Sequence, residues 1–212
     1  MLSKKCHCSA DTVSSLDNLA RLYQTQGKDA EAESLFVRAL AIREQQLGAN
    51  HPDIAQSLNS LAVLYGNQGK EAEAEPLFVR VLAIREQQLG ANHPDTASSL
   101  HNLAVLYGNQ GKEAEAEPLF ERALAIREQQ LGANHPDTAS SLHNLAVLYD
   151  SQGKDALAEP LYVRTLAIFE NMLGRNHPRT QRVRANYAAL LRTMERKKKR
   201  GGWKRIVFPF AR

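Results

Sequence analysis

The sequence Leu-Gly-Ala-Asn-His-Pro occupies residues 47–52 and returns at 89–94 and 131–136, with Leu-Gly-Arg-Asn-His-Pro at 173–178. Successive copies lie 42 residues apart, and the blocks 53–94 and 95–136 differ at only six positions. A fixed period of about 20 to 50 residues is typical of stacked repeat proteins, in which each unit buries its apolar face against its neighbours. The sequence therefore predicts one quasi-linear stack of repeats.

Each repeat contains two stripes of apolar residues at helical spacing. The first stripe runs from Pro52 to Gln68 and the second from about Glu71 to Leu89, which predicts an antiparallel helix pair with a tight turn. We call these helix A and helix B of the repeat. Asn50 and Asp53 are the expected capping residues at the start of helix A, and Gly69 suits a left-handed residue at its end. Pro76 lies early in helix B, where we expect it to bend the helix without ending it.

Small and large core residues recur in a fixed frame. The spacing Leu58-x2-Leu61-Ala62-x2-Tyr65, followed by Ala74-x3-Phe78, resembles the tetratricopeptide repeat pattern. The period of 42 instead of 34 is similar to that of the repeats of kinesin light chain and its non-motor relatives. The resemblance covers residues 11–194. It implies an all-α, right-handed superhelical solenoid of antiparallel helix pairs, with about four and a half repeats.

This frame divides the chain into segments. We expect a flexible N-terminal arm at 1–10, a solenoid at 11–194 and a basic, aromatic C-terminal tail at 195–212. Within the solenoid, the repeats are 11–52, 53–94, 95–136 and 137–178, and residues 179–194 form a capping helix. No cap precedes the first repeat, so its apolar edge, chiefly Leu16, Leu19 and Tyr23, suggests a partner, self-association or a chain cut from a longer array.

Charge is distributed unevenly along the chain. Residues 1–178 hold 15 Lys/Arg and 22 Asp/Glu, whereas residues 179–212 hold 12 Lys/Arg and one Glu. Any contact with a polyanion therefore belongs to the C-terminal end. Two interpretations of the tail stay open: a solvated end folded loosely against the last repeat, or a segment that contacts an anionic membrane surface or nucleic acid.

In tetratricopeptide stacks the A helices line a concave groove, and the resemblance assigns the matching residues of this chain to that surface. Repeat 2 would present Gln56, Asn59, Ser60, Val63 and Asn67; repeat 3 Ser98, His101, Asn102, Val105 and Asn109; and repeat 4 Ser140, His143, Asn144, Val147 and Ser151. Their amides can donate and accept hydrogen bonds at once, which suits an extended peptide backbone. In the alternative interpretation, Asn102 and Asn144 only bond to neighbouring helices.

Several other functions lack the residues they need. The clamp for a chaperone's C-terminal carboxylates needs Lys and Arg on the A helices, where repeats 2 to 4 have Ser and Asn. A motor subunit would need a long heptad segment, and the sequence has none.

Cys6, His7 and Cys8 lack a second cluster to complete a zinc site, and His101 and His143 lie about 10 Å apart in a helix stack, too far to share a metal. No phosphate loop or catalytic triad is present, so we expect neither an enzyme nor a cofactor.

The sequence thus predicts a soluble, cytoplasmic scaffold that binds a peptide segment or helix of a partner protein in its groove. The alternative from a different functional class is a structural or self-assembling repeat protein, whose copies join through the open end of the stack. An adaptor that contacts membrane or nucleic acid through the tail is the weaker alternative.

Overall fold

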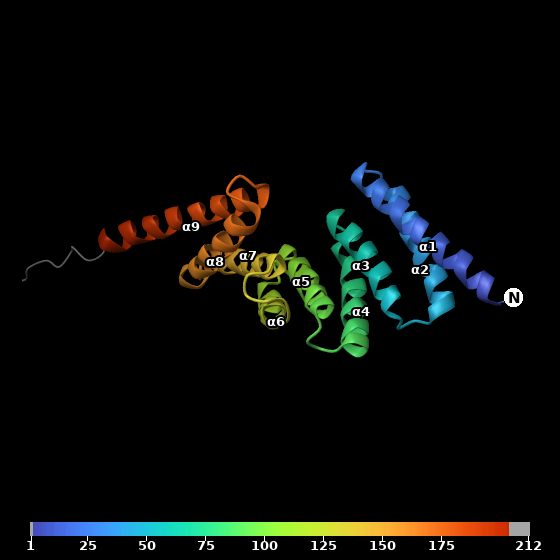
Figure 1. Ribbon diagram of the computed structural model, residues 1–212. Helices are drawn as coiled ribbons and strands as arrows, with labels where there is room; N and C mark the ends of the chain where they lie inside the picture. The colour runs from blue at the N-terminus through green and yellow to red at the C-terminus, as the bar shows by residue number, and fades with distance from the viewer. Residues whose placement is uncertain (1, 204–212) are drawn as a thin grey trace, which may run out of the picture. The chain divides into compact units, whose positions relative to one another are not determined.

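A computed structural model describes the backbone of residues 2–203 and the side chains of residues 12–199. The described residues form nine α-helices and no strand (Figure 1). Their bounds are α1 Leu2–Thr25, α2 Asp29–Leu47, α3 Pro52–Asn67, α4 Glu71–Leu89, α5 Pro94–Asn109, α6 Glu113–Leu131, α7 Pro136–Ser151, α8 Asp155–Leu173 and α9 Pro178–Trp203. The predicted all-α architecture of helix pairs is confirmed.

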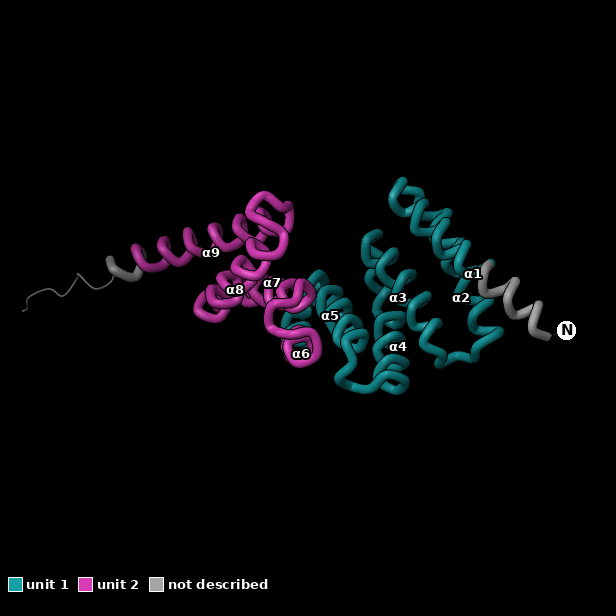
Figure 2. Tube along the Cα trace, in the orientation of Figure 1, with its two compact units in different colours: residues 1–119 teal, residues 120–212 magenta. Residues whose placement is uncertain are grey.

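The helices belong to two compact units, residues 1–119 and 120–212, and the division falls within α6 (Figure 2). In the first unit α1 packs on α2, α2 on α3, α3 on α4 and α4 on α5. In the second unit α7 packs on α8, and α9 packs on both α8 and α7. A helix inside a unit therefore packs against the other helix of its own pair and against a helix of the adjacent pair.

Histidine, and not the expected Asn50 or Asp53, caps the A helices. The Nδ1 atom of His51 accepts a hydrogen bond from the backbone N–H of Asp53 at 3.2 Å, and Pro52 follows as the first helical residue. His93, His135 and His177 make the same bond to the residue two positions later. The His-Pro motif thus satisfies an N–H group at the start of the helix that has no partner within the helix.

The core follows the frame predicted for each repeat. Ala62 and Ala74 have no exposed surface and share one apolar cluster with Phe78, Leu103 and Leu106. Between the helices, Gly69 has a φ of 72°, the left-handed conformation that a residue with a Cβ rarely adopts. Pro76 lies inside α4 without ending it.

Two helix ends differ from the segment boundaries expected from sequence. Helix α1 begins at Leu2, so its backbone includes residues assigned to the arm, and α9 continues to Trp203, past the expected end of the capping helix. The side chains of Cys6, His7 and Cys8, and all of residues 204–212, lie outside the described residues. The division of the chain at residues 10 and 194 stays a prediction. Among the described helices, none has the length and apolar content needed to cross a bilayer.

Buried arginines, which the apolar pattern did not indicate, join successive repeats. The Nη1 atom of Arg85 donates to the backbone carbonyl of Asp95 and to Ser99 Oγ, both at 3.0 Å. Arg127 repeats this arrangement one period later, at 3.2 Å to the carbonyl of Asp137 and 2.7 Å to Ser141 Oγ. Burial lowers the pKa of both guanidinium groups from the ordinary value for arginine, because water no longer solvates the charge.

Candidate functional site

Five of the predicted groove residues line one pocket in the first unit. The pocket has a volume of about 190 Å³ and lies between α3 and α5. Its predicted members are Val63, Asn67, Asn102, Val105 and Asn109, and Gly66, Phe78 and Leu106 complete the lining. Asn67 and Asn109 are exposed, and the other three predicted residues are half-buried. We call this site the amide pocket.

One amide in this pocket also holds the helices together. Asn102 Nδ2 donates to Asn59 Oδ1 at 3.0 Å, between α5 and α3. The bond to a neighbouring helix that the alternative interpretation expected is therefore present for Asn102, and that this bond is its only role stays a prediction. An amide has two N–H donors and a carbonyl acceptor, so this bond leaves Asn102 capacity to bond a ligand as well.

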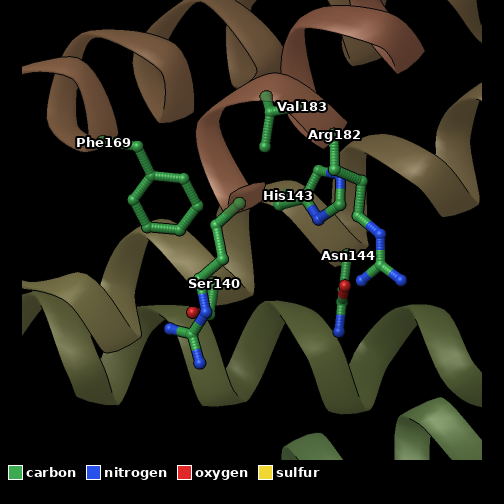
Figure 3. A pocket seen from close by; sticks show the side chains of 7 residues that line it. Ser140, His143, Asn144, Phe169, Arg182 and Val183 are labelled. Atoms are coloured by element: carbon green, nitrogen blue, oxygen red, sulfur yellow. The ribbon is translucent and has the colours of Figure 1, made fainter. Parts of the chain in front are cut away.

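Predicted groove residues from repeat 4 line a second pocket, in the other unit. Ser140, His143 and Asn144 of α7 meet Phe169 of α8 and three residues of α9, Arg179, Arg182 and Val183, around a volume of about 140 Å³. Figure 3 shows the His143 ring between Phe169 and Arg182. We call this site the arginine pocket.

The remaining predicted residues lie outside the linings of these two pockets. Gln56, Val147 and Ser151 are exposed, whereas Asn59, Ser60, Ser98 and His101 are half-buried. Val147 exposes 39% of its surface. None of the predicted groove residues is fully buried, so each is accessible from one side of its helix.

His143 is held in its uncharged form. Its Nε2 atom lies 3.1 Å from Asn186 Nδ2, and its ring centroid lies 6.1 Å from that of Tyr162. Burial, and next the positive charge of Arg182, lower the pKa of His143 from 6.5 to about 4. Near neutral pH the charge of the arginine pocket therefore comes from its arginines alone.

A titration of His143 followed by NMR should show a midpoint near pH 4 instead of 6.5. The pKa of His143 is lower in the folded chain than in the unfolded chain, so the unfolded chain takes up the proton first as the pH falls. The free energy of unfolding should therefore decrease as the pH falls from 6.5 towards 4. Arg182→Gln should raise the midpoint, since it removes the second cause of the shift. A midpoint near 6.5 in the unaltered chain would show that the ring is not buried as described.

Sequence reasoning missed the two arginines of the second pocket. Arg179 and Arg182 fall in the expected capping helix, where they contribute only to the overall charge of the C-terminal end. Comparing residues 42 positions apart would have found them, because they replace Asp137 and Ser140. Metal ligands do not gather at either pocket: no group of three or more His, Cys, Asp or Glu side chains with suitable placement occurs among the described residues.

Comparisons with known proteins point to one family. A sequence profile of the tetratricopeptide repeat matches residues 11–87, 61–129 and 95–171. A crystal structure of nearly identical tetratricopeptide-like repeats of a putative kinesin light chain from Podosopora anserina is similar over 88% of this chain and 89% of that one, with 31% identity and a TM-score of 0.74. The structure of BtubC (BKLC) from P. vanneervenii covers 100% of this chain and 95% of its own, with 24% identity and a TM-score of 0.75. No curated protein sequence matched.

Proposed function

Because the chain belongs to the tetratricopeptide repeat family, we propose that it is a scaffold that binds an extended peptide segment of a partner protein against its A helices. Proteins with this repeat are generally scaffolds for protein–protein interaction and are typically non-enzymatic. We extend both properties to this chain, together with the cytoplasmic location expected from its sequence. The amide pocket is the observation that carries the proposal.

The lining of the amide pocket matches the two kinds of group that an extended peptide offers. Val63, Val105 and Phe78 provide an apolar surface, while the amides of Asn67, Asn102 and Asn109 surround it. An apolar peptide side chain can enter the pocket, and the neighbouring peptide N–H and C=O groups can bond to the amides.

The volume of the amide pocket favours one side chain over a whole small molecule. Sites for drug-sized ligands and cofactors are typically about 300 to 1,000 Å³. At about 190 Å³, the amide pocket lies below that range. This supports a peptide ligand, which spreads its contacts over a surface and places single side chains in small hollows.

Val63→Asp with Val105→Asp should weaken peptide binding by about 100-fold or more, because each carboxylate would lose water next to the apolar groups of the ligand. A pool of random octapeptides is first passed over the immobilised chain, and the affinity of the most enriched peptide is then measured by fluorescence anisotropy. Val37→Asp with Val79→Asp is the matched control. Both control valines are 46% exposed, and they lie on the B helices α2 and α4.

The proposal requires that the control variant bind like the unaltered chain. An equal loss in both double variants would mean that added negative charge, and not the pocket, weakens binding. Failure of the unaltered chain to enrich any peptide would contradict the scaffold function itself.

The self-assembly alternative has its own supporting observation. On α1, Leu19 and Leu22 expose 39% and 51% of their surfaces, so an apolar edge is present at the first helix pair. A second copy of the chain could cover this edge. Oligomeric mass, measured over a range of concentrations, distinguishes this alternative from a scaffold that binds peptides as a monomer.

A further inference from the structure

The outer face of α8 is apolar along most of its length. Five residues follow one another at intervals of one, three and four and therefore lie on one side of the helix: Ala156, Leu157, Pro160, Val163 and Ala167. All five are exposed, and Leu157 and Val163 leave 50% and 49% of their surfaces uncovered. We call these five residues the α8 stripe.

The α8 stripe is the only one of its kind among the four B helices, because each of the others has a carboxylate on this face. The glutamates at positions equivalent to Leu157 and Val163 are Glu31 in α2, Glu73 in α4, and Glu115 and Glu121 in α6. In a chain whose repeats are nearly identical, the loss of every charge from one exposed face indicates a local change of role. Neighbouring exposed apolar residues of this kind are typical of an interaction site.

Helix α9 runs past the start of this stripe. Lys197 Nζ donates to Asp155 Oδ2 at 2.7 Å, and Asp155 immediately precedes the stripe in sequence. The helical backbone continues for six residues to Trp203, which is a distance of about 9 Å. The α8 stripe is therefore close to the point where the chain leaves α9.

The residues that follow α9 are long enough to turn back onto the stripe. Nine residues of the sequence follow Trp203, and nine extended residues span up to about 30 Å. The return from Trp203 to the level of Asp155 is about 9 Å, and Val163 lies about 12 Å further along α8. The segment can therefore cover the first half of the stripe with length to spare.

We propose that residues 206–210, Ile-Val-Phe-Pro-Phe, dock on the α8 stripe of the same chain. Pro209 disfavours a helical conformation for Phe208, and in an extended segment alternate side chains point to the same side. Phe208 and Phe210 thus share one face, which covers Leu157 and Val163 and removes apolar surface of both partners from water.

Tethering favours the chain's own segment over a second copy or another protein. A segment joined to its site by a short linker acts at an effective concentration on the order of millimolar, which free partners rarely reach. The docked segment holds the end of α9 against α8, in addition to the ion pair of Lys197 with Asp155. No residue of the α8 stripe lines the amide pocket or the arginine pocket, so this inference does not depend on peptide binding.

NMR on the full chain tests the docking through nuclear Overhauser contacts between the rings of Phe208 and Phe210 and the methyl groups of Leu157 and Val163. The stripe variant is Leu157→Glu with Val163→Glu. It gives α8 the residues that α6 has at the same two positions, so the change fits the repeat.

Val37→Glu with Val79→Glu is the matched control. It adds the same charge to the outer faces of α2 and α4, where both valines are 46% exposed. The unaltered chain and the control should show the ring-to-methyl contacts, and the stripe variant should lose them. In the stripe variant, the ring signals should move to those of a free peptide of residues 204–212, and amides at the end of α9 should exchange about 10-fold faster.

Three results would overturn the inference. The unaltered chain could lack contacts between these rings and these methyl groups, or its rings could contact Val63 and Val105 of the amide pocket instead. A sample that mixes isotope-labelled with unlabelled chains separates contacts within one chain from those between two chains. Contacts found only between chains would mean that a second copy covers the stripe.

Discussion

Leu190→Asp should release α9 from the repeat it covers and cause a large loss of stability at this end of the chain. Leu190 has no exposed surface, and α9 packs on α8, where Tyr162 and Phe169 are also buried. Truncating a buried leucine costs about 2–5 kcal/mol, and burying a carboxylate in its place costs more. Hydrogen exchange should therefore be about 1,000-fold faster in the amides of α9, since each 1.4 kcal/mol corresponds to about tenfold.

Ala189→Asp is the control for this experiment. Ala189 is exposed and adjacent in sequence, so the same charge is added to the same helix without entering the core. Exchange in α9 should then stay close to that of the unaltered chain. Equal acceleration in the two variants would show that Leu190 does not anchor the helix.

Arg127→Phe should destabilise the interface of α6 with α7 by about 2–4 kcal/mol. The change removes the donor to the carbonyl of Asp137 and to Ser141 Oγ, and a buried polar group left without a partner costs about 1–3 kcal/mol. Adding Ser141→Val should recover at least about 1 kcal/mol, because the pair then matches Phe169 and Val183 at the next interface. Hydrogen exchange of α7 measures the loss and the recovery.

The two single variants and the double variant form a thermodynamic cycle. Coupling between positions 127 and 141 is expected because the two side chains are hydrogen-bonded. If the effects of Arg127→Phe and Ser141→Val simply add, the buried arginine does not act as a link between the repeats.

The fold could be predicted in detail because the repeats are nearly identical. Helix bounds expected at Pro52–Gln68 and Glu71–Leu89 agree with the structure to within one residue, and the small residues Ala62 and Ala74 are buried where the frame placed them. Periodicity reports which residues face the core, so it is most informative about buried positions.

The periodicity of apolar residues says less about which polar side chains form hydrogen bonds. Asn50, His51 and Asp53 all have side chains that can cap a helix, and spacing alone does not distinguish them; the structure shows that His51 accepts the bond. Arg85 breaks the apolar stripe, and its burial could not be predicted because its partners are a backbone carbonyl and a serine on the next helix.

The candidate site was predicted only in part. The resemblance assigned residues on one face of the A helices to the groove, and five of them line the amide pocket together. It did not indicate the arginine pocket, because that pocket depends on residues that depart from the repeat. The role of all these residues in binding stays a prediction.

Peptide capture and oligomeric mass, measured on the same preparations, test the central claim most directly. The variants are Val63→Asp with Val105→Asp in the amide pocket, and Leu19→Asp with Leu22→Asp on the exposed edge of α1. A scaffold with a peptide-binding groove predicts that the pocket variant loses the selected peptide without a change in mass, while the edge variant still binds it. Growth of mass with concentration that only the edge variant abolishes, together with unchanged peptide capture by the pocket variant, would contradict the scaffold and favour self-assembly.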